Sequence, residues 1–438
     1  VICIDKRGAH GGTCLNVGCI PSKALLHASE VYHETKSSSS MGINVDNVSI
    51  NLQDMMNYKE EGISGNVKGI DFLFKKNKVE SVYGIAKILS SNQINIKLND
   101  GSEKLIEAKN IVIATGSESA SLNGIEIDEE KIVSSTGALS LEKIPEHLTI
   151  IGGGYIGLEL GSVWSRLGSK VTVIEYLDRI APGLDGELSS EFQKILKRQG
   201  IEFIVGAKVT GVEEKSDGLS VQIENVSSGE ISTLDSSIVL VSTGRIPNTI
   251  GLFDDDLGIQ LNEKGFIKTD KNYRTDVEGV WAIGDVIEGP MLAHKAEEEG
   301  VAVAELIKGK PGHVNYNIIP SVIYTNPEVA SVGLTEEQLN ESGTGYKVGK
   351  FPFTASGKAQ AGGHTEGFVK VIFDAKYGEW LGCHMIGAGV TDMIAEAVIG
   401  RKLETTGHEI LKAVHPHPTM SEAVMEAVAA AYDEVIHV

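Results

Sequence analysis

One stretch decides the fold: Leu148-Thr149-Ile150-Ile151-Gly152-Gly153-Gly154-Tyr155-Ile156-Gly157-Leu158-Glu159-Leu160. Its first four residues predict a buried strand, and a helix is expected to begin within the glycines that follow. Gly152, Gly154 and Gly157 have the spacing Gly-x-Gly-x-x-Gly. Such glycines let backbone amides approach a pyrophosphate at the positive end of the helix. The stretch therefore predicts a βα unit that binds a dinucleotide.

A second strand supports this interpretation. Residues 170–175, Lys-Val-Thr-Val-Ile-Glu, predict a strand that ends in an acid, at about the 20-residue distance expected for this unit. Glu175 would accept hydrogen bonds from ribose hydroxyls and repel a 2′-phosphate. Arg179 lies nearby, but one arginine after the acid does not outweigh it. We therefore expect NAD rather than NADP at this loop.

A pair of cysteines stands upstream, in the segment Gly11-Gly12-Thr13-Cys14-Leu15-Asn16-Val17-Gly18-Cys19-Ile20-Pro21-Ser22-Lys23. Two thiols that can close on each other form a two-electron switch, and Gly18 allows the chain to bend between them. Pro21 predicts the start of a helix. Cys19 would then lie just before that helix, where unpaired N–H groups and the helix dipole favour the thiolate.

Two other interpretations of the cysteine pair remain open at this point. A structural zinc site would need two further ligands at similar spacing, whereas Cys3 and Cys383 are isolated. A purely structural disulfide is typical of small secreted proteins that are rich in cysteine. This chain has only four cysteines in 438 residues. Redox chemistry is favoured, and we expect no metal site.

Length and charge limit the remaining possibilities. A chain of 438 residues predicts about three domains. With 60 acidic and 39 basic residues the net charge is −21, which argues against nucleic acid as a partner. No apolar stretch is long enough to predict a membrane span. Few cysteines and a working thiol pair favour a reducing compartment, either a bacterial cytoplasm or the mitochondrial matrix.

The cysteine segment closely resembles that of the flavin-dependent pyridine nucleotide-disulfide oxidoreductases, and the likeness continues along the chain. The resemblance implies an α/β fold with two Rossmann-like dinucleotide-binding domains, for FAD and NAD, and a C-terminal α+β interface or dimerisation domain. Strands such as residues 368–373 and a helix over residues 391–401 fit that last domain. The expected boundaries are 1–144 and 271–315 for the two parts of the FAD domain, 145–270 for the NAD domain and 316–438 for the interface domain.

The first residues also fit the resemblance. Residues 1–5, Val-Ile-Cys-Ile-Asp, predict a short strand that ends in an acid, as the second strand of a dinucleotide-binding unit does. The resemblance implies a strand and a glycine loop before it, so about 35 residues are expected to be missing at the front, with any targeting peptide. Asp5 would hydrogen-bond the adenosine ribose of FAD.

In this family the first cysteine exchanges with substrate and the second lies against the flavin. The resemblance therefore assigns substrate exchange to Cys14 and flavin contact to Cys19. It places Lys23 beside the flavin ring, paired with Glu159 on a later helix.

The segment His415-Pro416-His417-Pro418-Thr419-Met420-Ser421-Glu422 opens a final predicted helix. A His-Pro pair alone is more often a rigid turn than a base. Beside the thiol motif, the segment resembles the family signature that supplies a catalytic base and an acid that orients it. These would be His417 and Glu422. His415 is one step removed in the pattern and would not contact the substrate directly. In the family this histidine reaches the cysteines of the other subunit, so the resemblance implies a homodimer.

The other cofactor positions implied by the resemblance lie in short segments. They are Gly12 and Thr13 beside the first cysteine; Ala114, Thr115 and Gly116 after a strand; Gly244 and Arg245 at the end of the NAD domain; Gly284 and Asp285, whose carboxylate would bind a ribityl hydroxyl; and Met291, Leu292, Ala293 and His294 near the flavin ring. We expect His294 to pack or hydrogen-bond rather than to act as an acid or base.

The implied function is oxidation of protein-bound dihydrolipoamide to lipoamide with reduction of NAD, in 2-oxo acid dehydrogenase or glycine cleavage complexes. Implied partners are a lipoyl domain of an acyltransferase or the glycine cleavage H protein, and a peripheral subunit-binding domain, whose basic surface would suit the net charge. One alternative is an NAD(P)H-dependent reductase of another disulfide, similar to glutathione reductase, which Tyr155 in the glycine loop slightly favours. A second alternative is a non-catalytic scaffold.

Overall fold

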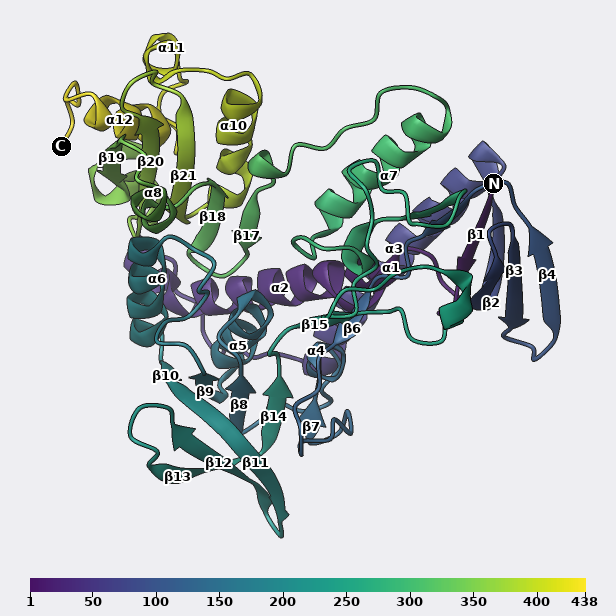
Figure 1. The fold of residues 1–438 in the computed structure, drawn as a ribbon. Helices are drawn as coiled ribbons and strands as arrows, with labels where there is room; N and C mark the ends of the chain where they lie inside the picture. Colours follow the sequence, from purple (N-terminus) through teal and green to yellow (C-terminus); the bar gives the residue numbers. More distant parts are fainter.

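The computed structural model describes residues 1–438, and its middle part contains a five-stranded sheet in the order β10-β9-β8-β14-β7, parallel throughout (Figure 1). The strands are β7 (Ile132–Val133), β8 (His147–Ile151), β9 (Lys170–Glu175), β10 (Ile201–Val205) and β14 (Ile238–Val241). The helices of this part are α4 (Ser135–Ala138), α5 (Tyr155–Leu167) and α6 (Gly186–Arg198), and a separate antiparallel sheet contains β11 (Ala207–Lys215), β12 (Gly218–Asn225) and β13 (Ile231–Ser236). The predicted strand, glycine loop, helix and second strand are confirmed.

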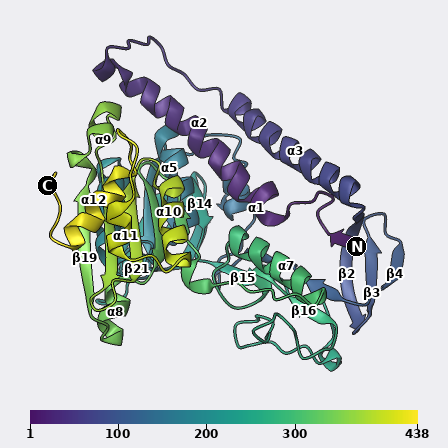
Figure 2. The same cartoon turned by 90° about the horizontal axis from the view of Figure 1, so that it is seen from above.

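The first part of the chain combines a small sheet with long helices. Strand β1 (Ile2–Asp5) pairs in parallel with β2 (Glu80–Ser90), and β3 (Gln93–Leu98) and β4 (Glu103–Glu107) complete the sheet. The helices are α1 (Gly12–Val17), α2 (Cys19–Ser37), the short 3₁₀ helix η1 (Ser38–Met41) and α3 (Leu52–Asn77). Helices α2 and α3 lie side by side (Figure 2). The inner face of α2 contributes Leu25 and Leu26 to the core that it shares with the parallel sheet.

Two short strand pairs join distant parts of the sequence. Strand β5 (Ile111–Ile113) pairs in parallel with β16 (Val280–Ala282), and β6 (Ser117–Ser119) pairs antiparallel with β15 (Arg245–Pro247). The 3₁₀ helices η2 (Asp255–Leu257) and η3 (Gly284–Val286) and the helix α7 (Ala293–Ile307) follow. Segments that precede and follow the parallel sheet in the sequence therefore pair with each other.

The C-terminal part is an antiparallel sheet in the order β17-β18-β21-β20-β19, with α10 and α12 packed on it. Its strands are β17 (Ser321–Ile323), β18 (Glu328–Gly333), β19 (Tyr346–Pro352), β20 (Phe368–Asp374) and β21 (Trp380–Gly387). Its helices are η4 (Tyr316–Ile318), α8 (Glu336–Ser342), η5 (Phe353–Ala355), α9 (Gly357–Gly362), α10 (Val390–Lys402), α11 (Gly407–Lys412) and α12 (Glu422–Ala431). The predicted α+β character is confirmed.

Strand β20 does not alternate between buried and exposed side chains, because Phe368 to Phe373 are all buried. Val369 and Val371 pack in the core beneath the helices, while Lys370 reaches Asp185 at the start of α6 on the other face. Both faces of the strand are therefore covered.

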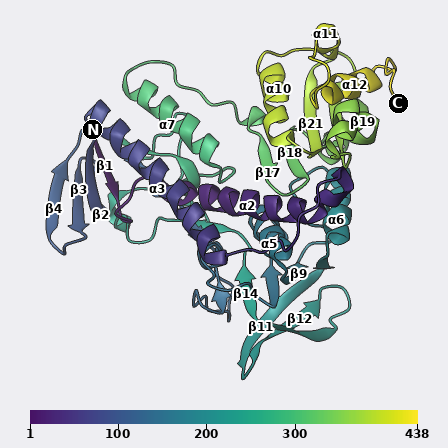
Figure 3. The ribbon, with the colours of Figure 1, turned by 180° about the vertical axis from the view of Figure 1, so that it is seen from behind.

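Figures 1 and 3 show the β1–β4 sheet and the C-terminal sheet at opposite ends of the molecule, with α2 running between them. No helix combines the length and the apolar composition that crossing a membrane requires. No group of three or more His, Cys, Asp or Glu side chains is placed to hold a metal ion.

Candidate active site

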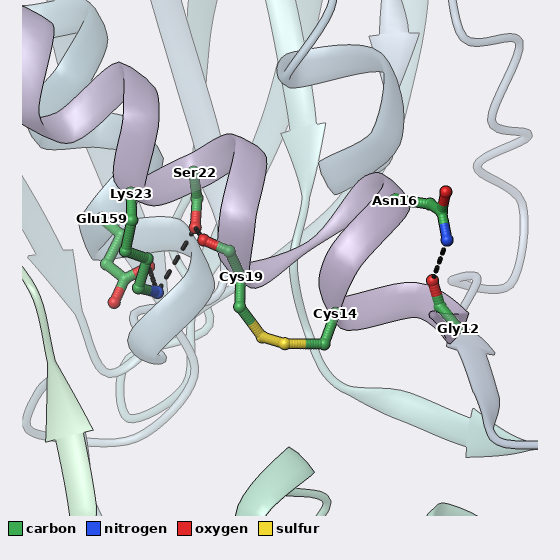
Figure 4. The surroundings of a disulfide bond; sticks show 7 residues. All are labelled: Gly12, Cys14, Asn16, Cys19, Ser22, Lys23 and Glu159. Carbon is green, nitrogen blue, oxygen red and sulfur yellow. Dashed lines mark hydrogen bonds and ion pairs between the residues drawn. A yellow bond between two sulfur atoms is a disulfide. The ribbon is translucent and has the colours of Figure 1, made fainter. Parts of the chain in front are cut away.

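Cys14 in α1 and Cys19 at the start of α2 form a disulfide, with their Cα atoms 4.5 Å apart (Figure 4). Gly18 makes this approach possible, since a Cβ atom there would lie 2.9 Å from the backbone oxygen of Thr13. The predicted closure of the two thiols is confirmed. Because the sulfurs bind each other, neither is a zinc ligand in this state.

The predicted start of the second helix is wrong by two residues. Helix α2 begins at Cys19 rather than at Pro21, because the Ser22 N–H already donates to the Gly18 oxygen at 3.0 Å. Pro21 is the third helical residue, where its missing N–H has no helical partner to lose. Cys19 therefore lies in the first turn, whose free N–H groups and dipole favour a thiolate when the disulfide opens.

The ion pair predicted between Lys23 and Glu159 is present, with Nζ 2.9 Å from Oε2 (Figure 4). The other carboxylate oxygen of Glu159 accepts the N–H of Tyr324 at 3.0 Å, and Lys23 Nζ lies 4.4 Å from the centre of the Tyr324 ring. Three elements, α2, α5 and the end of β17, thus fix this cation near the disulfide. The sequence gave no signal for Tyr324, which belongs to no motif.

The glycine loop between β8 and α5 has the geometry that a pyrophosphate requires. A Cβ at Gly152 would lie 2.6 Å from the Ser242 oxygen, and one at Gly157 would lie 2.5 Å from the Gly152 oxygen. A Cβ at Gly154 would meet nothing within 4 Å. Two glycines therefore permit close packing, and the third leaves open space at the helix N-terminus, so these residues fit a dinucleotide.

Glu175 is buried at the end of β9, next to this loop. Its carboxylate accepts the N–H of Gly153 at 2.6 Å and the N–H of Leu177 at 2.8 Å. The acid therefore helps to hold the glycine loop, and each of its oxygens has a further lone pair for a ribose hydroxyl. This second task of Glu175 was not predicted.

Asp285 lies in η3, directly after β16. Its Oδ2 accepts the hydroxyl of Ser117 at 2.5 Å, and Arg245 Nε donates to that hydroxyl oxygen at 2.7 Å. Nearby, Thr115 and Asn248 exchange side-chain to backbone hydrogen bonds of 2.7 and 3.0 Å. These bonds join the turns at residues 115–117, 245–248 and 284–285, which the sequence singled out separately; Ser117, which links them, was missed.

Gly116, Gly244 and Gly284 have positive φ values, and a Cβ at Gly116 or Gly244 would meet nothing within 4 Å. The joined turns therefore leave open space beside a carboxylate. A carboxylate suits the hydroxyls of a flavin side chain, so these residues fit the implied flavin.

The remaining predicted flavin residues lie in three places. Asp5 accepts the Arg7 N–H at 2.8 Å, and the Arg7 guanidinium donates to the Thr13 hydroxyl at 3.2 Å. The Gly12 oxygen accepts the Asn16 side chain at 2.9 Å. Met291 and Leu292 lead into α7, which begins at Ala293. His294 Nε2 lies 2.9 Å from the Pro320 oxygen, so His294 takes one of the two arrangements expected for it, a hydrogen bond within the chain.

His417 lies before α12 with its side chain 79% exposed, and its Nδ1 is 2.8 Å from Glu422 Oε1. The Thr419 N–H donates to the other oxygen of Glu422 at 2.8 Å. That backbone bond, aided by the histidine, lowers the pKa of the Glu422 carboxyl. The ionised acid therefore orients the imidazole and leaves its Nε2 facing outward. His415 is tied to Glu396 on α10 at 2.7 Å, which raises the pKa of His415.

A single chain does not bring the histidine and the disulfide together. Helix α12, which follows His417, lies at the C-terminal end of the molecule, whereas helix α1, which carries Cys14, lies nearer the middle, away from α12 (Figures 1 and 2). An exposed histidine that lies away from the disulfide of its own chain is the arrangement expected if the histidine serves a second copy.

The chain matches two family models. Residues 1–300 match the pyridine nucleotide-disulphide oxidoreductase model, and residues 319–428 match the dimerisation domain of the same group. The second match supports a homodimer.

Similar proteins agree with these matches. The chain is 50% identical over 437 residues to the mitochondrial dihydrolipoyl dehydrogenase of Pisum sativum, covering 100% of this chain and 87% of the pea protein. It is 50% identical to dihydrolipoyl dehydrogenase 3 of Pseudomonas putida, covering 98% of this chain and 92% of that protein. The solved structure of the HOCl-induced flavoprotein disulfide reductase RclA from Escherichia coli superimposes with a TM-score of 0.86 at 26% identity, covering 98% of this chain and 94% of that one.

Proposed function

We propose, from the premise that this chain belongs to the pyridine nucleotide-disulphide oxidoreductase family, that it oxidises dihydrolipoyl groups to lipoyl groups and reduces NAD⁺. The observation that carries the proposal is the Cys14–Cys19 disulfide in a chain half identical to dihydrolipoyl dehydrogenases over its full length. A disulfide that lies at a helix N-terminus beside a lysine is suited to exchange, since the thiolate that leaves is stabilised there.

The exchange begins with a thiolate of the substrate. It attacks Cys14 Sγ, forms a mixed disulfide and releases Cys19 as a thiolate in the first turn of α2. The second substrate thiol then loses its proton and attacks the substrate sulfur of the mixed disulfide. This step closes the lipoyl ring and releases Cys14, so that two electrons now reside on the cysteine pair.

His417 is the proposed base for the substrate thiols. Glu422 holds Nδ1 and so leaves Nε2 free to accept a proton. Because His417 and the disulfide are apart in one chain, the base would come from the second subunit of the homodimer.

The cofactors are expected to be FAD and NAD. When bound, they would supply the acceptor for the electron pair of the reduced cysteines and the chemistry of hydride transfer. Lys23 and Glu159 would lie beside the flavin, Asp285 would bind its ribityl chain, and Gly152, Gly154 and Gly157 would hold the pyrophosphate of NAD. The residue limits expected for the FAD, NAD and interface domains belong to this proposal as well.

Proposed partners are the lipoyl domain of an acyltransferase or the glycine cleavage H protein, with a peripheral subunit-binding domain as the anchor in a larger complex. The similar proteins include a mitochondrial and a bacterial enzyme. We propose a matching location, the mitochondrial matrix or a bacterial cytoplasm, where thiols stay reduced between turnovers.

The test mixes purified protein with reduced lipoamide and either NAD⁺ or NADP⁺ and follows nicotinamide absorbance. We expect rapid reduction with NAD⁺, slower reduction with NADP⁺, and none for the Cys14→Ser variant. Reduction of glutathione disulfide with NADPH, without oxidation of dihydrolipoamide, would instead support a reductase of another disulfide.

A further inference from the structure

A buried lysine and a buried glutamate lie under the turn that carries Asp285, outside every motif discussed so far. Lys295 and Glu299 occupy positions i and i+4 of α7, and both side chains are 0% exposed. Their charged atoms lie 3.1 Å apart. Two charges placed wholly out of water are costly unless they are paired and hydrogen-bonded, so their presence calls for a reason.

Both charged groups bind the same residue. The Gly284 N–H donates to Glu299 Oε2 at 2.7 Å, and Lys295 Nζ donates to the Gly284 oxygen at 3.0 Å. The two residues of one ion pair therefore hydrogen-bond the peptide groups before and after Gly284. Gly284 has φ +74°, a conformation that glycine adopts freely and that hydrogen bonds of this kind keep in place.

A third side chain completes the cluster. The hydroxyl of Tyr316 donates to Glu299 Oε1 at 2.6 Å. Burial, together with this hydrogen bond, raises the pKa of Tyr316, so the hydroxyl keeps its proton. Glu299 thus uses one oxygen for the turn and the other for Tyr316 and Lys295, which leaves the carboxylate a single orientation.

We propose that Lys295 and Glu299 are positioning residues that fix the Gly284–Asp285 turn in the conformation that binds the flavin. The inference rests on the proposed function, since it assumes that Asp285 contacts FAD. Asp285 needs such support because the only hydrogen-bond partner of its side chain is the Ser117 hydroxyl. A turn that is already fixed before FAD arrives loses less conformational entropy on binding.

The test replaces both charges, as Lys295→Met with Glu299→Met, because a buried ion pair can often be exchanged for apolar side chains of similar size without unfolding the protein. The measurement is the FAD dissociation constant of the purified holoprotein, obtained by separating bound from free flavin and reading flavin absorbance. We expect the constant to rise at least about tenfold, since both Gly284 bonds are lost.

Two further variants keep the test decisive. Tyr316→Phe removes the hydroxyl bond to Glu299 and the longer 3.4 Å contact with the Tyr273 hydroxyl, leaves no unpaired charge, and is expected to raise the constant about threefold. Lys370→Met is the control, because Lys370 forms another buried ion pair, 2.9 Å from Asp185, with no contact to the turn. It is expected to lower the unfolding temperature and to leave the FAD dissociation constant of the folded protein unchanged.

The inference is overturned if the double variant folds and binds FAD as tightly as the wild type, or if Lys370→Met weakens FAD binding equally. If the double variant does not fold, the test rests on Tyr316→Phe, and an unchanged FAD dissociation constant in that variant overturns the inference. Oxidation of dihydrolipoamide by the wild-type protein is measured separately, so that failure of the positioning role and failure of the proposed function give different results.

Discussion

Glu175 is the single residue on which the choice between NAD and NADP is expected to depend. A carboxylate at the end of β9 repels the extra phosphate of NADP. Glu175→Gln should raise the rate with NADP⁺ relative to NAD⁺ by about tenfold, which corresponds to ~1.4 kcal/mol. Steady-state rates with the two nucleotides test this. Glu202→Gln, on the neighbouring strand β10, is the control and should leave the ratio unchanged; an unchanged ratio in Glu175→Gln would refute the role.

His415 gives the C-terminal part a pH dependence with a definite sign. Its hydrogen bond to Glu396 raises its pKa in the folded state above the unfolded value of about 6.5. The stabilisation is therefore complete below the unfolded pKa and is lost as the pH rises through the folded pKa. Denaturant unfolding at fixed protein concentration should show this loss in the wild type and much less of it in Glu396→Gln. If the stability of the wild type and of Glu396→Gln changed with pH in the same way, the pair of His415 and Glu396 would not be the cause of the loss.

Individual site residues were predictable when a motif named them. The cysteines, Lys23, Glu159, His417 and Glu422 form the contacts expected between them. Ser117, Tyr324, Lys295 and Glu299 were missed, because each acts by a bond to a turn or side chain distant in sequence. A buried lysine on α7 looks like a surface residue until the packing is known.

The βα unit of the glycine loop supports a prediction that separates packing from binding. Gly157→Ala places a methyl group 2.5 Å from the Gly152 oxygen and should destabilise the fold by about 1–3 kcal/mol. Gly154→Ala enters open space, has an ordinary φ of −82°, and should cost less than about 1 kcal/mol.

The same methyl group at Gly154 fills the space proposed for the pyrophosphate. Gly154→Ala should therefore raise the KM for NAD⁺ while keeping its unfolding temperature. Thermal melting and steady-state kinetics on both variants test the pair, and a Gly154→Ala protein with an unaltered KM would exclude a pyrophosphate at this helix.

Strands with strong apolar patterns were predicted closely, and β9 begins and ends where expected. Helix α2 begins earlier than predicted because Gly18, rather than Pro21, ends the preceding turn. The full burial of β20 depends on a second layer of structure, which a pattern within one strand does not reveal.

The separation of His417 from the disulfide leads to a prediction about the dimer. Cys14→Ser and His417→Gln homodimers should each be inactive or nearly so. If the base comes from the other subunit, a hybrid dimer of the two variants has one site with both an intact Cys14 and an intact His417. Co-expression should then restore about a quarter of wild-type activity, because about half of the dimers are hybrids with one working site. A base that acts within its own chain would leave every site of the hybrid defective, and no activity would return.

The most direct measurement counts which thiols open. The holoprotein is mixed without oxygen with dihydrolipoamide, quenched with an alkylating reagent, and examined by mass spectrometry. Exchange at the disulfide predicts that Cys14 and Cys19 are alkylated only after dihydrolipoamide is added, while buried Cys383 stays unmodified. Equal alkylation of Cys14 and Cys19 with and without dihydrolipoamide, in a protein that still reduces NAD⁺, would show that the electrons take another route.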